Sequence, residues 1–154
     1  MSDNQAAPAD PVTERTLEVL QRELPDAVVA SEVTGLHPWI QVDPARIHDV
    51  LELMRDDDAL LFDSVHLISG VDWPGKGKDV GEIEVVYHMV SYARKPDPSY
   101  GKREGKNDPW VAIKARVPRD KPELPSVMDL WEGADWHERE TYDLLGVIFT
   151  GREE

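Results

Sequence analysis

The chain has no cysteine among its 154 residues, and this absence excludes several kinds of site. Without cysteine it forms no disulfide, offers no thiolate to zinc and supplies none of the usual ligands of an iron–sulfur cluster. Any redox chemistry in which the chain takes part must therefore be carried by other molecules.

Basic residues and long apolar runs are also scarce. The 17 Lys and Arg stand against 31 Asp and Glu, which gives a formal net charge of −14 at pH 7. Such a surface repels nucleic-acid phosphates and anionic lipid. No apolar run reaches the ~18 residues of a membrane span, and the N-terminus lacks the basic and apolar parts of a signal peptide. We expect a soluble protein that does not bind nucleic acid.

The hydrophobic pattern predicts one α+β domain over residues 11–154, after a polar, disordered tail over residues 1–10. Helices are predicted after Asp10 and Asp43, because each is a capping residue followed by a proline. Strands are predicted over residues 27–30, 39–42, 65–71, 83–91 and 110–117. The pattern favours a mixed or antiparallel sheet of about four to five strands with helices on one face. A C-terminal helix pair is expected within residues 124–150.

Two loops are candidate binding segments. Residues 94–108 form a long, locally basic loop, which is either a plain mobile loop or a docking loop for an acidic neighbour. Residues 70–77 have the glycine and lysine spacing of a phosphate-binding loop, but Gly77 replaces the hydroxyl residue that binds magnesium and no helix start follows. A hairpin turn is the preferred interpretation of residues 70–77.

The five histidines show no metal-ligand spacing. His137 and Glu140 are three residues apart, but a helical zinc motif needs a second histidine four residues on, where the chain has Thr141. Glu138 and Glu140 are two apart on a predicted helix and do not face each other, so they form no acid–base pair. We expect no metal or cofactor on this chain.

The most informative segment is residues 124–150, which combines two tryptophans with many charged side chains. On a helix, Ala134, Glu138, Thr141, Tyr142 and Leu145 share one side, so Glu138 should be partly buried in the more apolar stripe. A buried carboxylate needs a donor. Either a capping box begun by Asp135 or an arginine, in this chain or in a partner, could supply it.

The opposite side of this predicted helix carries Asp135, Arg139 and Asp143 at four-residue spacing, with Trp136 and Glu140 beside them. A solvated ion ladder would not need a tryptophan, because such pairs contribute only ~0.3–0.5 kcal/mol each. Large aromatics beside fixed charges are typical of protein interfaces. We therefore favour an interface over a solvent-facing helix.

The same segment resembles the 30 kDa subunit family, also called the C subunit, of the proton-pumping NADH-quinone oxidoreductase, respiratory complex I (NDH-1). The resemblance covers roughly residues 13–151, and its specific part is the last thirty residues. The residues that carry it are Leu124-Pro125-Ser126-Val127, Asp129-Leu130-Trp131, Glu138-Arg139-Glu140, Tyr142-Asp143-Leu144-Leu145-Gly146 and Phe149.

This resemblance implies a non-catalytic peripheral-arm subunit on the cytoplasmic side of the bacterial membrane. It would carry no cofactor itself and would dock on the D and B subunits, while FMN, iron–sulfur clusters and quinone belong to the rest of the complex. The motif residues would serve assembly rather than catalysis. The predicted partner interface consists of Trp131, Asp135, Trp136, Glu138, Arg139, Glu140, Tyr142 and Asp143.

Three alternatives stay open. The same module could serve an energy-converting hydrogenase-type complex with another electron source. The chain could also be a free-standing acidic adaptor for some other partner. The rival enzyme would be a hydrolase that uses Glu138 or Glu140 with His137.

Overall fold

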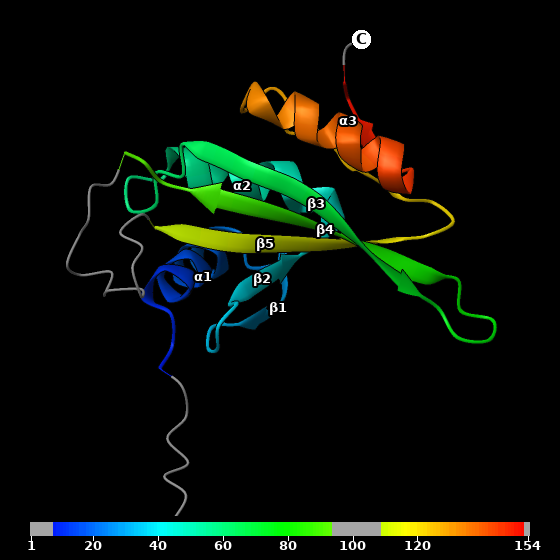
Figure 1. Ribbon diagram of the computed structural model, residues 1–154. Coiled ribbons are helices and arrows are strands. Elements are labelled where there is room, and N and C mark those ends of the chain that lie inside the picture. The colour runs from blue at the N-terminus through cyan, green and yellow to red at the C-terminus, as the bar shows by residue number, and fades with distance from the viewer. Residues whose placement is uncertain (1–7, 94–108, 153–154) are drawn as a thin grey trace, which may run out of the picture.

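A computed structural model describes residues 8–93 and 109–152 and shows helices packed against a twisted sheet (Figure 1). The elements, in chain order, are α1 (Pro11–Glu23), β1 (Val28–Glu32), β2 (Trp39–Val42), the 3-10 turn η1 (Pro44–Arg46), α2 (Ile47–Asp56), β3 (Ser64–Pro74), β4 (Gly81–Val90), β5 (Trp110–Pro118), β6 (Glu123–Pro125), α3 (Gly133–Leu145) and β7 (Ile148–Thr150).

The two N-terminal helices begin where the capping residues predict. The Asp10 carboxylate accepts the Thr13 backbone N–H at 2.9 Å, and Pro11 occupies the first turn of α1, where its missing N–H leaves no bond unmade. Asp43 caps η1 in the same way by accepting the Ala45 N–H, and α2 follows directly. Both predicted helices are confirmed.

The main sheet has the strand order β1-β2-β5-β4-β3. Neighbouring strands are antiparallel except β2 and β5, which are parallel, so the sheet is mixed. All five predicted strands are present, and β1 and β2 form the predicted hairpin around Gly35. The α+β class and the mixed five-stranded sheet are therefore confirmed.

The core lies on one face of this sheet. Ile83, Val85, Tyr87 and Met89 alternate along β4 toward that face and join buried residues of α1 and α2 in one cluster. The third helix lies on the same side, because Gly70 pairs with Val85 and a Cβ at Gly70 would stand 2.2 Å from Leu145 Cδ1. The helices thus cover one face, as the alternating pattern predicts.

The predicted C-terminal helix pair is wrong in its first half. Within the described residues the C-terminal region has one helix, α3, and residues 123–125 form β6, which pairs in parallel with β7. Proline explains the difference: Leu124 precedes Pro125, and the proline ring disfavours helical backbone at the residue before it. Leu124 is extended, and its buried side chain contributes to the core.

Some predictions fall partly outside the described residues. The loop 94–108 and residues 1–7 of the predicted tail lie there, whereas Asp10 caps α1 and donates its N–H to the Val33 carbonyl. Residues 70–77 belong to β3 and its hairpin turn, with no helix following, as the preferred interpretation predicts. Among the described residues, no helix has the length and apolar character needed to cross a bilayer.

Candidate functional site: the surface of α3

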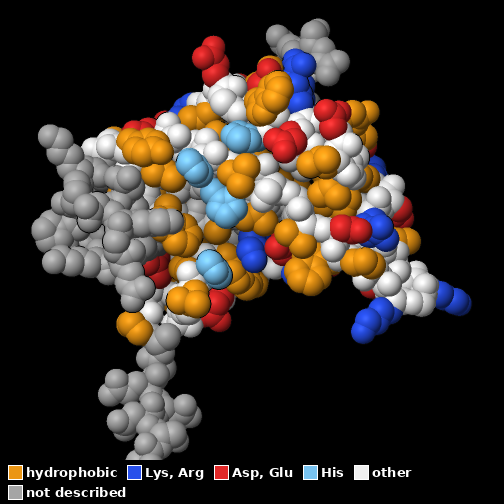
Figure 2. All heavy atoms as spheres, viewed as in Figure 1, with side chains coloured by type: hydrophobic (Ala, Val, Ile, Leu, Met, Phe, Trp, Pro, Cys, Tyr) orange, Lys and Arg blue, Asp and Glu red, His pale blue; other side chains and the backbone are white. Residues whose placement is uncertain are grey.

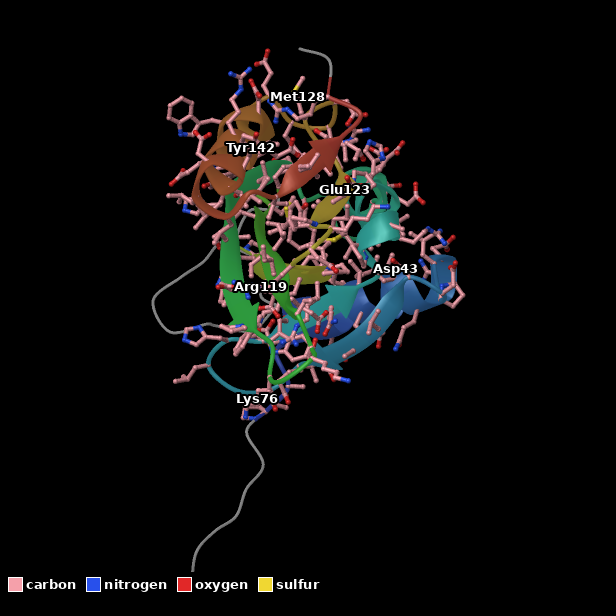
Figure 3. All side chains as sticks on the ribbon, turned by 90° about the vertical axis from the view of Figure 1, so that its right-hand side faces the viewer. Asp43, Lys76, Arg119, Glu123, Met128 and Tyr142 are labelled. Atoms are coloured by element: carbon pink, nitrogen blue, oxygen red, sulfur yellow. The ribbon has the colours of Figure 1, made fainter. Side chains whose placement is uncertain are left out.

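Helix α3 lies in the sequence between β6 and β7, two short strands that pair in parallel. The chain runs from β6 through residues 126–132 into α3 and returns to β7, where the Ser126 N–H donates to the Thr150 carbonyl at 2.8 Å. Gly146 ends the helix with φ of 73°, a left-handed conformation that glycine adopts without strain. Figure 3 shows Tyr142 on α3 and Met128 on the preceding connection at the same end of the molecule.

Glu138 connects α3 to the segments that precede and follow it in the chain. Its side chain is completely buried, and its carboxylate accepts hydrogen bonds from Ser126 Oγ at 2.6 Å, the Val127 backbone N–H at 2.9 Å and Arg152 Nη1 at 2.9 Å. The sequence predicts both the burial and the need for a donor. The arginine alternative is confirmed, with Arg152 of the same chain as the partner.

The surroundings of Glu138 affect its pKa in two opposite directions. Burial raises the pKa of Glu138, while the bonds from Ser126, Val127 and Arg152 act in the opposite direction. The pKa of Tyr87 is raised well above its usual value by complete burial and secondarily by the charge of Glu138. The Tyr87 hydroxyl has no hydrogen-bond partner among the described residues.

Asp135 does not cap the helix, so the predicted capping box is wrong. Glu132 precedes the first helical residue, Gly133, and Asp135 lies within the first turn. Its carboxylate instead accepts from Arg139 Nε at 2.9 Å and forms an ion pair with Arg152. Hydrogen bonds from these two arginines lower the pKa of Asp135. Of the predicted row Asp135, Arg139 and Asp143, the ion pair between Asp135 and Arg139 is therefore present.

The outer surface of α3, defined by Trp136, Arg139, Glu140, Asp143 and Leu144, faces solvent. Trp136 is 72% exposed and Leu144 is 74% exposed, although both are large apolar side chains. Tyr142, which the sequence places on the buried side, is also exposed. The predicted exposure of Trp136 is confirmed, and whether this surface contacts a partner stays a prediction.

Trp131 differs from the other predicted interface residues. It is partly buried, packs against the core, and its indole Nε1 has no hydrogen-bond partner among the described residues. Its main contact is with the chain's own interior. The structure therefore brings Asp135, Trp136, Arg139, Glu140 and Asp143 onto the solvent side and places Glu138 on the opposite side.

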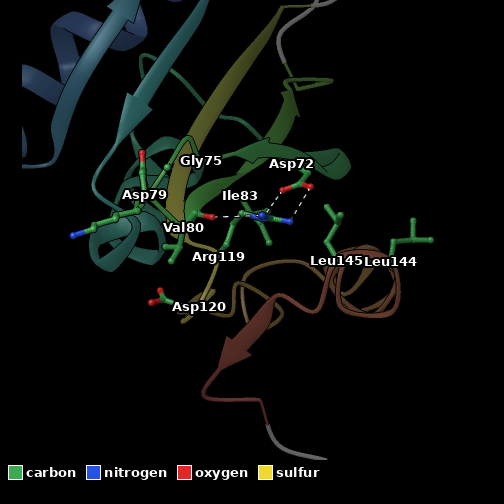
Figure 4. Close-up of a pocket in the computed structure, with 11 residues that line it drawn as sticks. Asp72, Gly75, Asp79, Val80, Ile83, Arg119, Asp120, Leu144 and Leu145 are labelled. Atoms are coloured by element: carbon green, nitrogen blue, oxygen red, sulfur yellow. Dashed lines mark hydrogen bonds and ion pairs between the residues drawn. The ribbon is translucent and has the colours of Figure 1, made fainter.

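A cleft of about 730 Å³ lies between the C-terminal end of α3 and the β3–β4 hairpin (Figure 4). On the hairpin side Arg119 pairs with Asp72, Nε to Oδ1, at 2.9 Å. Leu144 and Leu145 of α3 form the opposite wall. Leu144 thus belongs both to the outer surface of α3 and to the lining of the cleft.

The positions of Glu138 and Glu140 do not support the hydrolase alternative. Glu138 is buried and committed to three donors, whereas Glu140 points to solvent. The described part of the chain holds no group of three His, Asp or Glu side chains that could bind a metal ion. The chemistry available at α3 is recognition through apolar contact and charge.

Sequence reasoning missed two residues that position α3. Ser126 and Arg152 bind Glu138 from twelve residues before it and fourteen residues after it. A signal for Arg152 was present, because it is the only Lys or Arg after Arg139. Ser126 had no comparable signal, since a single serine is common in connecting segments.

These features define an α+β chain with an exposed aromatic helix anchored by a buried carboxylate. The chain belongs to the family described as respiratory-chain NADH dehydrogenase, 30 Kd subunit, whose sequence model matches residues 40–154. The resemblance carried by residues 124–150 is thereby confirmed.

Proteins of similar sequence support this family assignment. The chain is 37% identical over 135 residues to the NADH-quinone oxidoreductase C subunit of Roseiflexus sp. (strain RS-1), covering 88% of this chain and 68% of that protein. It is 33% identical to the F(420)H(2) dehydrogenase C subunit of Methanosarcina mazei, covering 90% and 76%. It spans 54% of the NADH-quinone oxidoreductase C subunit of Xanthobacter autotrophicus, to which it is 35% identical.

Solved structures share the fold. The trypsin-resistant fragment (1-134) of Nqo5 superposes with a TM-score of 0.63 at 28% identity, covering 93% of this chain and 98% of the fragment. A chain of the membrane-bound sulfane sulfur reductase, an archaeal respiratory membrane complex, superposes with a TM-score of 0.66 at 27% identity, covering 91% and 71%.

Proposed function

We propose that this chain is a non-catalytic scaffold subunit in the peripheral arm of a proton-translocating NADH-quinone oxidoreductase. It docks on the D and B subunits at the cytoplasmic side of the bacterial membrane and binds no cofactor itself. Electrons pass from NADH through FMN and iron–sulfur clusters to quinone on its companions. Family membership supports this proposal, as does the lack of cysteine, since the chain has no thiolate for a cluster.

The observation that carries the docking role is the exposure of Trp136 and Leu144 on α3. Burying such side chains stabilises a complex by ~1.5–3 kcal/mol each, and aromatic anchors of this kind dominate many interfaces. The buried Glu138 carboxylate, bonded to Ser126, Val127 and Arg152, anchors the helix without a partner. A preorganised surface loses less entropy on binding.

A second candidate is the equivalent subunit of a related complex with a different electron donor. The 33% identity to the F(420)H(2) dehydrogenase C subunit of Methanosarcina mazei favours it. Donor oxidation by the purified complex separates the two: oxidation of NADH supports the first candidate, and oxidation of reduced F420 without NADH oxidation supports the second.

The docking role is tested by tagging the full chain in its own cells and identifying the proteins that copurify with it. Trp136→Ala should leave the free energy of unfolding of the isolated chain within about 0.5 kcal/mol of wild type. Incorporation into the complex should fall on the order of tenfold or more, because an interface anchor is lost. Arg139→Ala should weaken incorporation and quinone-linked activity together.

Trp131→Ala is the matched control, because Trp131 packs against the core. It should reduce the free energy of unfolding of the isolated chain by about 2 kcal/mol or more. Wild-type incorporation of both Trp136→Ala and Arg139→Ala would show that the outer surface of α3 does not dock. Copurification without any flavin or iron–sulfur protein would refute the subunit role itself.

A further inference from the structure

Arg152, which follows β7, divides its guanidinium between two carboxylates of α3. Its Nη1 donates to Glu138 Oε1 at 2.9 Å, and its Nη2 forms an ion pair with Asp135 Oδ1. Nη1 also donates to the Asp135 backbone carbonyl at 3.4 Å. An arginine that served Glu138 alone would place both Nη nitrogens on that carboxylate, because a planar guanidinium favours bidentate pairing. The division between the two carboxylates indicates a second role for Arg152, at Asp135.

Asp135 is shared in turn with Arg139, which belongs to the outer surface of α3. Arg139 Nε donates to Asp135 Oδ1 at 2.9 Å, and this is the same oxygen that pairs with Arg152. The two residues of α3 are four apart, so their side chains are neighbours on the helix. Hydrogen bonds from Arg139, and secondly from Arg152, lower the pKa of Asp135. Asp135 therefore connects an arginine after β7 to an arginine on the outer surface of α3.

The four side chains form one series of ion pairs from the core to solvent. The exposed fraction of the side chain rises from 0% at Glu138 to 12% at Arg152, 39% at Asp135 and 62% at Arg139. Figure 2 shows acidic, basic and apolar side chains together over α3, in the upper part of the molecule. An isolated surface pair barely recovers the entropy of ordering two long side chains. This series starts at a buried group that two further hydrogen bonds hold in place.

We propose that Arg152 is a positioning residue for docking, because through Asp135 it holds the Arg139 side chain in the orientation that the partner subunit binds. Arg152 is mostly buried and lies outside the outer surface of α3, so it acts on docking through the two residues between it and the partner. The inference rests on the proposed function, since it names the residue that regulates the same surface. The rival explanation is that Arg152 only neutralises the buried charge of Glu138.

The test removes the contact between Arg152 and Asp135 without leaving a buried charge unpaired. Arg152→Met alone would leave the Glu138 carboxylate without its cation, so Arg152→Met is made in a chain that also carries Glu138→Gln. The glutamine amide can still bond to Ser126 and accept the Val127 N–H. Glu138→Gln alone is the reference, because Arg152 can still pair with Asp135 in that variant.

The first measurement is the order of the Arg139 side chain in the isolated full chain, from ¹⁵N relaxation of its Nε–H group. Adding Arg152→Met to the reference should lower the order parameter of Arg139 Nε to the flexible range, below about 0.6. Arg119 is the internal control, because its Nε pairs with Asp72 Oδ1 at the same distance of 2.9 Å and should keep its order. An unchanged order parameter of Arg139 Nε overturns the proposal, whatever happens to incorporation.

The second measurement is a cycle on incorporation into the complex, read by competition against wild-type chain. In the Glu138→Gln reference, Arg152→Met should lower incorporation about fivefold with Arg139 present and less than about twofold in an Arg139→Ala background. The effect should shrink because a residue that acts through Arg139 has nothing left to position once that side chain is gone. Equal fold-losses in the two backgrounds overturn the proposal and support the rival explanation.

Arg152→Lys in an otherwise wild-type chain decides the matter if the Arg152→Met variant fails to fold. Lysine keeps a cation beside Glu138, but its single Nζ cannot occupy both Nη positions. The proposal predicts lower Arg139 Nε order and an incorporation loss of about fivefold, whereas wild-type values of both would overturn it. Wild-type incorporation of Arg139→Ala also overturns this inference, and the outer surface of α3 loses its docking role only if Trp136→Ala is incorporated normally as well.

Discussion

At the residue scale, Glu138 shows how a charge is accommodated in a core. A buried carboxylate costs several kcal/mol unless donors replace its water. Glu138 has three, from a side chain, a backbone amide and an arginine. The amphipathic pattern of α3 was sufficient to predict its burial and its need for a donor. It could not identify Ser126 or Val127, because their approach depends on the path of residues 126–132.

Glu138→Ala should destabilise the isolated chain by about 3 kcal/mol, because Arg152 and the Val127 N–H would lose their buried acceptor. Urea denaturation of the purified chain measures this change in the free energy of unfolding. Glu140→Ala, on the exposed side of the same helix, is the control and should stay within about 0.5 kcal/mol of wild type. A loss for Glu138→Ala no larger than the control's would contradict the anchoring role.

His88 gives a pH prediction. Burial, with smaller contributions from His66 and Lys114, lowers the pKa of His88 from its ordinary value of 6.5. The unfolded chain therefore binds this proton more readily than the folded chain, so stability is retained above pH 6.5 and is lost as the pH falls through the folded value. Denaturant midpoints measured from pH 7.5 downward should decline more steeply for wild type than for His88→Gln. Parallel profiles would rule out a contribution from His88.

At the element scale, the sequence predicted best where the local signal was strong. The two Asp-Pro starts located α1 and η1 with α2, and alternation located β3, β4 and β5. Prediction from the sequence failed at β6, because its three residues, between Pro122 and Ser126, are too few to show a recognisable period. The pairing of β6 with β7 joins segments more than twenty residues apart, so only the tertiary fold determines it.

The contact between α3 and β3 depends on Gly70. A Cβ at this position would stand 2.2 Å from Leu145 Cδ1, so Gly70→Ala requires α3 or the Leu145 side chain to shift. We expect a loss of about 1–3 kcal/mol in the free energy of unfolding, the usual range for overpacking. In a Leu145→Ala background the cost of Gly70→Ala should shrink, which a double-mutant cycle measures.

Gly133→Ala is the control for this prediction. No atom lies within 4 Å of a Cβ at Gly133, and its φ is not positive. The substitution should stabilise the chain by about 0.4–1 kcal/mol through the lower entropy of the unfolded state. If Gly70→Ala lowers the free energy of unfolding equally in the wild-type and Leu145→Ala backgrounds, the strain does not come from contact with Leu145.

At the scale of the whole molecule, the sheet separates two surfaces of different character. The outer surface of α3 lies on the side that the helices cover and exposes Trp136 and Leu144. The other face of the sheet carries Lys114 and Arg116 paired with Glu84, and the exposed Glu32 and Glu82 lie at its ends.

Independence of the two surfaces can be measured. If the outer surface of α3 and the sheet face that carries Arg116 contact different parts of the assembly, the effects of Trp136→Ala and Arg116→Gln on incorporation should multiply, because substitutions that share no partner add in free energy. Competition of each variant against wild-type chain for incorporation, read from the subunit ratio in the purified complex, gives the three fold-changes required. A double variant no weaker than Trp136→Ala alone would mean that the face carrying Arg116 contributes nothing once α3 is released from its partner.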